Sequence, residues 1–126
     1  MKTTAAILSA LLVALVAVSG AGAGSSTTVR PGTKLVLTVG PGFTITLKTA
    51  TGKAFTALKK GKYTIVVRDK ASIHNAHLRA PGGINKATGV AFVGTKTWKV
   101  TFAKTGTLRF QCDPHASSMH GAKKIV

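Results

Sequence analysis

Apolar residues recur at every second position in several short runs of this chain, and this feature constrains its fold most strongly. The runs are Leu35–Val39, Phe43–Leu47, Tyr63–Val67, Trp98–Phe102 and Leu108–Cys112, and Ile125–Val126 closes the chain. Turn-forming residues such as Gly40-Pro41-Gly42 and Thr105-Gly106 separate them. Such alternation is typical of strands with one buried face. Six to eight short strands in about 100 residues predict an all-β chain folded as an antiparallel β-sandwich.

The stretch from Ala80 to Gly94 shows no clear alternation, and it contains Pro81-Gly82-Gly83 and Gly89. We therefore predict an irregular connection here, running between the two sheets. No window of the chain shows a helical apolar stripe. A length of 126 residues indicates one domain, and a hydrophobic fraction of 44% is high enough for a packed core.

The first 23 residues have the features of a secretory signal peptide. Lys2 provides a positive start, Ala5–Val18 is an apolar run broken only by Ser9, and Ala21-Gly22-Ala23 matches a cleavage pattern. An uncleaved anchor is the alternative, but the run is shorter than the roughly 20 residues that span a bilayer. We predict a signal peptide at 1–23, a flexible leader at 24–32 and a folded domain at 33–126. The protein is then secreted or periplasmic, and no transmembrane span remains after cleavage.

The chain is strongly basic. It has 18 Lys and Arg residues against two acids, Asp69 and Asp113, which gives a formal charge of +16. Loss of Lys2 with the signal peptide leaves +15, far beyond what solubility requires. We expect this charge to attract an acidic partner protein or an anionic envelope surface, although lysines more often only solubilise a surface. Nucleic acid is not expected as a partner, because the chain is exported, has few aromatic residues and lacks a nucleic-acid motif. The densest clusters are Lys59, Lys60 and Lys62, and Lys123 with Lys124.

The residues with the most distinctive chemistry are Cys112, His115 and Met119, which follow the pattern C-x₂-H-x₃-M after a predicted strand. His74 lies about 40 positions earlier, where a sandwich can place it alongside. A thiolate, two imidazoles and a weak axial thioether form the ligand set of a blue-copper site. One cysteine excludes an internal disulfide and a Cys₄ zinc site. Four histidines cannot build the additional centres of a copper oxidase, so an enzyme is not expected.

Each of these residues also has a simpler interpretation. Cys112 could be a buried apolar residue and Met119 could fill the core. His74 and His77 are three positions apart, so in a strand only one of them can face the metal. We favour His74 because Asn75 follows it; His77 is then expected at the surface or an edge. His120 could be an exposed imidazole through which electrons leave, or a solvated residue without a role. His77 and His120 remain possible alternative ligands.

From Thr33 to Val126 the sequence resembles the cupredoxins, the plastocyanin-like blue copper proteins. The resemblance rests on His74-Asn75, on Cys112-Asp113-Pro114-His115, and on Met119 followed by Gly121 and a closing strand. It implies an eight-stranded Greek-key sandwich with one copper ion bound at one end by His74, Cys112, His115 and Met119. It also implies that Asn75 hydrogen-bonds to the cysteine loop. Pro114 cannot donate a hydrogen bond to the thiolate, and Asp113 either anchors the loop or starts a turn.

The resemblance implies one-electron transfer, with copper cycling between Cu(II) and Cu(I). We also expect the protein to be a monomer. Two alternatives remain open at this stage. The same ligands could sequester or deliver copper without transferring electrons. A metal-free cationic sandwich could instead bind anionic envelope polymers through its lysines.

Overall fold

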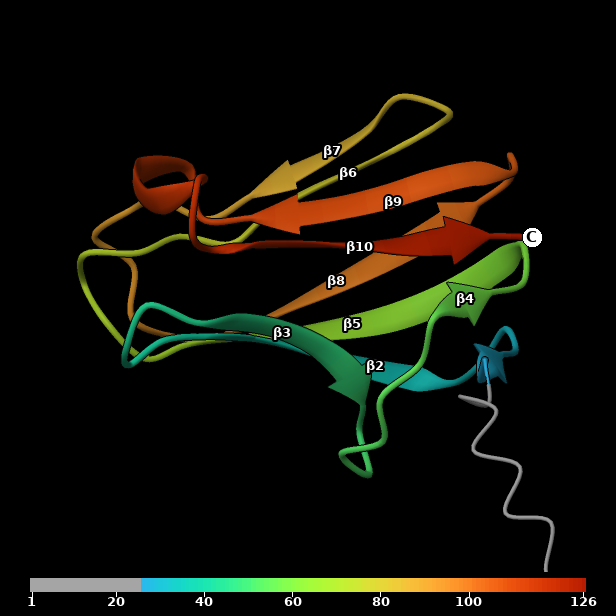
Figure 1. The fold of residues 1–126 in the computed structure, drawn as a ribbon, viewed down its shortest axis with the longest axis horizontal. Coiled ribbons are helices and arrows are strands. Elements are labelled where there is room, and N and C mark those ends of the chain that lie inside the picture. Colours follow the sequence, from blue (N-terminus) through green and yellow to red (C-terminus); the bar gives the residue numbers. More distant parts are fainter. Residues whose placement is uncertain (1–25) are drawn as a thin grey trace, which may run out of the picture.

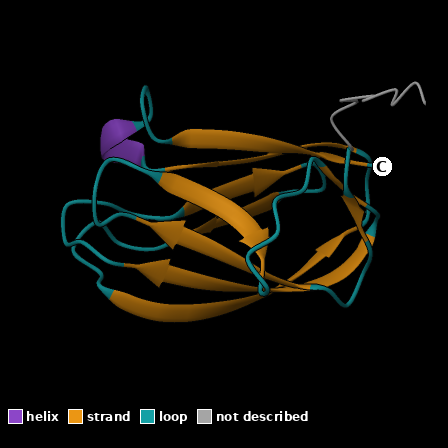
Figure 2. Cartoon of the chain, turned by 60° about the horizontal axis from the view of Figure 1, so that its bottom comes forward, coloured by secondary structure: helices purple, strands orange, loops and turns teal. Residues whose placement is uncertain are grey.

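The computed structural model describes residues 26–126 (Figure 1). The predicted signal peptide lies outside the described residues. Two β-sheets pack face to face, and one short 3₁₀ helix, η1, lies at one end of the sandwich (Figures 1 and 2). No helix in the described part is long and apolar enough to cross a membrane. The elements are β1 (Thr28–Val29), β2 (Lys34–Val39), β3 (Ile45–Thr49), β4 (Ala57–Leu58), β5 (Gly61–Asp69), β6 (His77–Ala80), β7 (Ile84–Ala87), β8 (Gly94–Phe102), β9 (Gly106–Gln111), η1 (Asp113–His115) and β10 (His120–Ile125).

The larger sheet has the strand order β1-β4-β10-β9-β6-β7, and the smaller sheet has the order β3-β2-β5-β8. The prediction of an all-β sandwich is confirmed. Both sheets are mixed, however, and not purely antiparallel. β2 pairs with β5 in parallel, and β4 pairs in parallel with β1 and with β10. Parallel neighbours arise because the chain crosses between the sheets instead of returning through a hairpin.

The core lies between the two sheets and follows the alternation seen in the sequence. In β2 and β5, every second residue is completely or almost completely buried, while the residues between them are more exposed. Side chains from the two inner faces form one apolar cluster. The alternation thus predicted the buried face of these strands correctly, because successive side chains of a strand point to opposite faces.

Two segments differ from the sequence-based expectation. Ile84–Ala87, which we expected to be irregular, forms β7 and pairs with β6. Its side chains are only half-buried or exposed, so the strand lacks an apolar pattern. Thr28–Val29, within the expected flexible leader, forms β1. This short strand pairs with β4, and the Val29 side chain is buried. The packed part of the chain therefore includes residues before Thr33.

The sandwich has two distinct ends. One end, which we call the η1 end, is formed by the loops 40–44, 70–76, 88–93 and 112–119 (left in Figure 1). The other end carries the turns 30–33, 59–60, 81–83 and 103–105 and the C-terminus. All four predicted copper ligands belong to loops of the η1 end.

Gly121 offers a test of core packing close to this end. It pairs with Phe110 across β9 and β10, and a Cβ atom built on Gly121 would overlap the Phe110 ring. We predict that Gly121→Ala lowers the free energy of unfolding by about 1–3 kcal/mol, the usual cost of overpacking. The measurement is chemical denaturation of the metal-free protein. Gly89→Ala is the control, because its Cβ meets nothing within 4 Å. An equal loss in both variants would contradict the packing explanation.

Candidate metal centre

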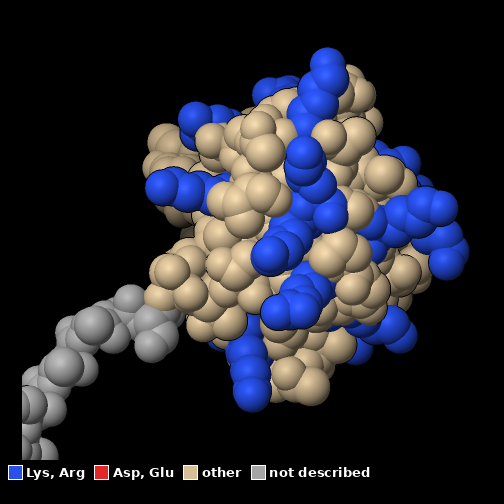
Figure 3. All heavy atoms as spheres, turned by 90° about the vertical axis from the view of Figure 1, so that its right-hand side faces the viewer, with Lys and Arg blue, Asp and Glu red and all other residues tan. Residues whose placement is uncertain are grey.

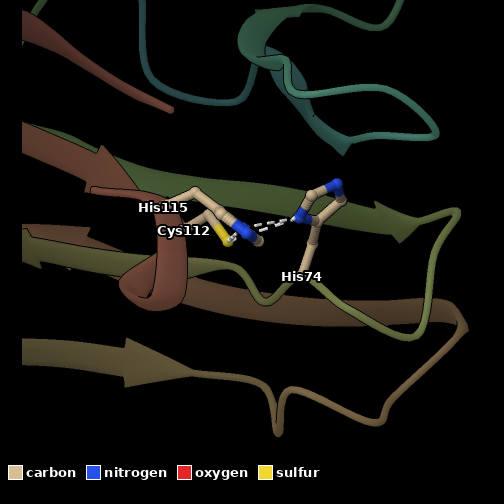
Figure 4. Close-up of side chains that lie close together, drawn as sticks. All are labelled: His74, Cys112 and His115. Atoms are coloured by element: carbon tan, nitrogen blue, oxygen red, sulfur yellow. Dashed lines mark hydrogen bonds between the residues drawn. The ribbon is translucent and has the colours of Figure 1, made fainter. Parts of the chain in front are cut away.

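Three potential ligand atoms converge at the η1 end (Figure 4). Nδ1 of His74 lies 3.1 Å from Nδ1 of His115, and Sγ of Cys112 lies 3.7 Å and 3.6 Å from these two nitrogens. His74 and Cys112 are completely buried, and His115 is partly exposed. His74 comes from the loop before β6, whereas Cys112 and His115 come from the segment after β9. The fold therefore brings together residues that are about 40 positions apart in the sequence.

The spacing of these atoms fits a metal ion. They form a nearly equilateral triangle, whose centre lies about 2 Å from each atom. This distance is close to the length of metal–ligand bonds in zinc proteins, where metal–nitrogen bonds are about 2.0–2.1 Å and metal–sulfur bonds about 2.3 Å. A planar set of two imidazole nitrogens and one thiolate is also the trigonal arrangement that blue-copper sites use. The three donor atoms and the distances between them are thus both compatible with a bound metal ion.

His77, one of the two possible alternative ligands, lies in a different environment from His74. His77 is the first residue of β6, and its Nδ1 lies 2.8 Å from Oδ1 of Asp113. Its Nε2 lies 2.6 Å from Oδ1 of Asn85. The expectation that His77 lies at the surface or an edge is wrong, because β6 lies between two neighbouring strands and the residue is only 8% exposed. His77 is therefore not part of the ligand triangle. It contacts the loop 112–119 through the carboxylate of Asp113.

Met119 and His120 end the same loop. Met119 is completely buried, its backbone N–H donates to the carbonyl of His115, and its own carbonyl accepts from Cys112 N–H. These bonds close the loop on itself and hold Met119 at the start of β10. His120 is exposed, and its Nδ1 lies 2.8 Å from the carbonyl oxygen of Ala116. His120 is outside the group of converging ligand atoms.

Asn75 and Asp113 join the two ligand-bearing segments through a pair of hydrogen bonds. The side-chain amide of Asn75 donates to Oδ2 of Asp113 at 2.9 Å, and Asp113 N–H donates to Oδ1 of Asn75 at 2.7 Å. Asn75 also donates to the carbonyl of Thr88. Burial alone would raise the pKa of Asp113, but hydrogen bonds from Asn75, Gln111 and His77 outweigh it and lower the pKa to about 2. The carboxylate therefore stays ionised and anchors the loop at neutral pH.

The Cys112 sulfur accepts one backbone hydrogen bond, from Asn75 N–H at 3.4 Å. Pro114 follows two residues after Cys112 and has no N–H to offer. A thiolate with few donors keeps more electron density on sulfur, which favours the more highly charged state of a bound metal. Asn75 thus contacts both the ligand sulfur and the residue beside it.

The sequence-based reasoning missed Asp69 and Phe43. Asp69 ends β5 and is almost completely buried; burial raises its pKa, while Ala71 N–H and the charge of His74 lower it to a smaller extent. Oδ2 of Asp69 and Nε2 of His74 are buried atoms without a hydrogen-bond partner among the described residues. Phe43 is 59% exposed and packs edge-on against the rings of His74 and His115. The rarity of acids was a usable signal for Asp69, because both acids of the chain lie beside ligand segments.

Gly40 lets the backbone of the β2–β3 loop approach His74 closely. A Cβ atom on Gly40 would lie 3.1 Å from Cδ2 of the imidazole, and the φ of Gly40 is +67°, which favours glycine. The Gly40–Pro41 peptide bond is cis. The histidine ring is thus packed from two sides, by Gly40 and by Phe43.

The five lysines that we considered for partner docking lie away from the ligands. Lys59 and Lys60 form the β4–β5 turn, Lys62 is the second residue of β5, and Lys124 is the last residue but one of β10, so all four lie towards the opposite end of the sandwich. Lys123 is only partly exposed, because its Nζ donates to the carbonyl of Phe55 and lies over the Phe55 ring. The structure therefore separates these lysines from the η1 end.

No protein-family model matches the chain, and no curated protein sequence matches it either. Solved structures do match. One is the copper protein rusticyanin, with a TM-score of 0.53, 17% identity, and coverage of 79% of this chain and 82% of that one. Reduced rusticyanin matches with a TM-score of 0.52 and 18% identity, and the match covers 79% of this chain and 84% of that one. Reduced auracyanin from the photosynthetic bacterium Roseiflexus castenholzii matches with a TM-score of 0.55 and 16% identity, and the match covers 76% of this chain and 98% of that one. These similarities show that the chain has the cupredoxin fold.

The Asn75–Asp113 pair should stabilise the protein without any metal. We predict that Asn75→Ala lowers the free energy of unfolding by about 2–3 kcal/mol, because it removes three hydrogen bonds and leaves the buried carbonyl of Thr88 and the partly buried N–H of Asp113 without the partner that Asn75 supplies. Denaturation in the presence of a chelator measures this loss. Gln111→Ala, which removes one exposed bond to the same carboxylate, should cost under about 1 kcal/mol. Similar losses in both variants would show that Asn75 has no special role.

Proposed function

We propose that this protein binds one copper ion in a type-1 site and carries single electrons outside the cytoplasm. The convergence of two Nδ1 atoms and one sulfur, at 3.1–3.7 Å from one another, is the observation that supports this most strongly. The cupredoxin fold provides a second, independent line of support. Copper bound here would supply one-electron chemistry by alternating between Cu(II) and Cu(I).

The protein residues would have distinct roles in such a site. His74, His115 and Cys112 would hold the ion in a trigonal plane, and Met119 would act as the weak axial ligand. Asn75 would hold the two ligand loops at a fixed separation, because it bonds to Asp113 and to the Cys112 sulfur. A ligand set that is fixed by protein hydrogen bonds cannot adjust to each oxidation state. That constraint keeps the reorganisation accompanying electron transfer small.

The burial of the ligands favours electron transfer over copper delivery. His74, Cys112 and Met119 are completely buried, so release of the ion would require the loop 112–119 to open. Four loop hydrogen bonds, among them Cys112 N–H to Met119 O at 2.9 Å and Met119 N–H to His115 O at 2.8 Å, oppose that opening. His115 alone among the four is partly exposed. An electron can leave through its ring while the ion stays in place.

The first test of the metal assignment is optical. We expect the copper-loaded protein to absorb intensely at about 600 nm, as the resemblance to blue copper proteins implies. Cys112→Ser should abolish the band, because the band depends on the copper–thiolate bond, and His115→Gln should strongly alter it. His120→Gln is the matched control, since this exposed histidine is outside the ligand triangle and should leave the spectrum unchanged. A colourless Cu(II) complex of the unaltered protein would disprove the type-1 assignment.

A second test separates a carrier from a copper-delivery protein. The loaded protein is reduced and reoxidised repeatedly in the presence of an excess of a Cu(I)-specific chelator. For a carrier, we expect the blue absorption to return almost fully after each cycle, because the buried ligands retain Cu(I). Loss of copper to the chelator on the first reduction would instead identify a delivery or sequestration protein. That result would leave the copper site supported and would disprove the electron-transfer role.

A further inference from the structure

The charges of the described residues are divided between the two ends of the sandwich. Both acids lie towards the η1 end, since Asp69 ends β5 and Asp113 begins η1. Figure 3 shows the opposite end, where many basic side chains and no acidic one are visible. Seven exposed basic residues belong to the turns and strand ends there, and we call them the basic cap: Arg30, Lys34, Lys59, Lys60, Lys62, Lys104 and Lys124.

The η1 end has the opposite character. Its loops 40–44, 70–76, 88–93 and 112–119 contain a single lysine, Lys70, and no arginine. Four of the five large apolar side chains that are exposed in the described chain belong to these loops or adjoin them: Phe43, Ile73, Val90 and Val93. A partner that docks over the ligands would therefore meet an apolar surface, and the cap would face away from it. The cap needs a different partner.

The basic cap is a fixed surface and not a flexible tail. Lys59 N–H donates to the carbonyl of Val29, Lys60 N–H donates to that of Val126, and Gly32 N–H donates to that of Lys62, each at 2.9–3.0 Å. The buried Tyr63 hydroxyl donates to the Lys59 carbonyl at 2.7 Å. These bonds tie four chain segments from both sheets together. The backbone positions that carry these basic side chains are therefore fixed at this end of the sandwich.

We propose that the basic cap binds the surface of an anionic phospholipid bilayer and turns the η1 end away from it. The charges are spread over one whole end, and the cap carries no acid that would repel headgroup phosphates. Each lysine or arginine near an anionic bilayer adds to the attraction. This proposal goes beyond the proposed function, because it requires neither copper nor electron transfer.

The position where the described chain begins supports a bilayer over a soluble polymer. Ser26 precedes β1, and β1 pairs with β4 directly beside the cap. Only residues 19–25 separate Ser26 from the apolar run Ala5–Val18. Seven residues span at most about 25 Å. During export, before the predicted signal peptide is cleaved, this short connection would hold the cap next to the headgroups; after cleavage, the charges of the cap alone would keep it there.

The test is binding to vesicles by residues 24–126, which contain both sheets and all four predicted ligands. Vesicles with about 30 mol % phosphatidylglycerol are compared with vesicles of phosphatidylcholine alone. The variant Lys59→Gln/Lys60→Gln/Lys62→Gln should reduce partitioning onto the anionic vesicles about 100-fold, at roughly fivefold per lysine. The matched control is Arg68→Gln/Lys70→Gln/Lys96→Gln, which removes the same charge from exposed positions near the η1 end and should change partitioning less than about fivefold.

Each outcome decides the proposal. Binding that needs anionic lipid, weakens with salt and is lost selectively in the cap variant supports it. Equal losses in both triple variants would show a diffuse effect of net charge and overturn it. Binding to an anionic polysaccharide but not to the vesicles, or equal binding to both kinds of vesicle, would also overturn it. Circular dichroism of both variants confirms that they are folded. Cys112→Ser should bind as the unaltered chain does, so the result is independent of the copper assignment.

Discussion

The pairing of β6 with β9 is the constraint on which the candidate metal centre depends. His77 pairs with Gln111 and Leu78 pairs with Phe110, so the residues before β6 and those after β9 leave the sheet side by side. The two ligand loops therefore start from adjacent positions, and Asn75 and Asp113 need only close a short gap between them. A shift of this register by one residue would turn the side chains of β6 to the opposite face and separate the loops. The core thus determines the geometry of the site through a single strand pair.

The sequence contained enough information for the fold class and for the convergence of His74, Cys112 and His115, but not for the surroundings of these residues. Alternation identified β2, β3, β5, β8 and β9 because each has one face in the core. It could not identify β7, which lies at a sheet edge with no buried face, or β1, which is only two residues long. Parallel pairing was also beyond reach, because it depends on which strands become neighbours after the chain crosses between sheets.

The environment of His77 illustrates the same limit. A three-residue separation in a strand suggests that His74 and His77 face opposite sides, and this led to a surface position for His77. In the structure His74 precedes β6 and only His77 belongs to it, so the period-two argument does not apply to the pair. His77 is buried because Asp113, from a segment 36 positions later, supplies a partner for its ring. Such a long-range pairing leaves no local signal in the sequence, although the scarcity of acids marked Asp113 as unusual.

The distribution of charge changes how the high net charge should be understood. A large positive charge on a protein suggests electrostatic steering of an acidic partner towards the functional site. In this protein the positive charge is concentrated away from the candidate site, because the basic cap lies at the opposite end of the sandwich and both acids lie near the ligands. An anionic surface would orient the molecule with its cap inward, so the apolar loops and the partly exposed His115 would face outward. Orientation by charge and recognition by an apolar surface would then act at opposite ends. One small domain could therefore engage a fixed anionic surface and a mobile redox partner at once, without competition between the two.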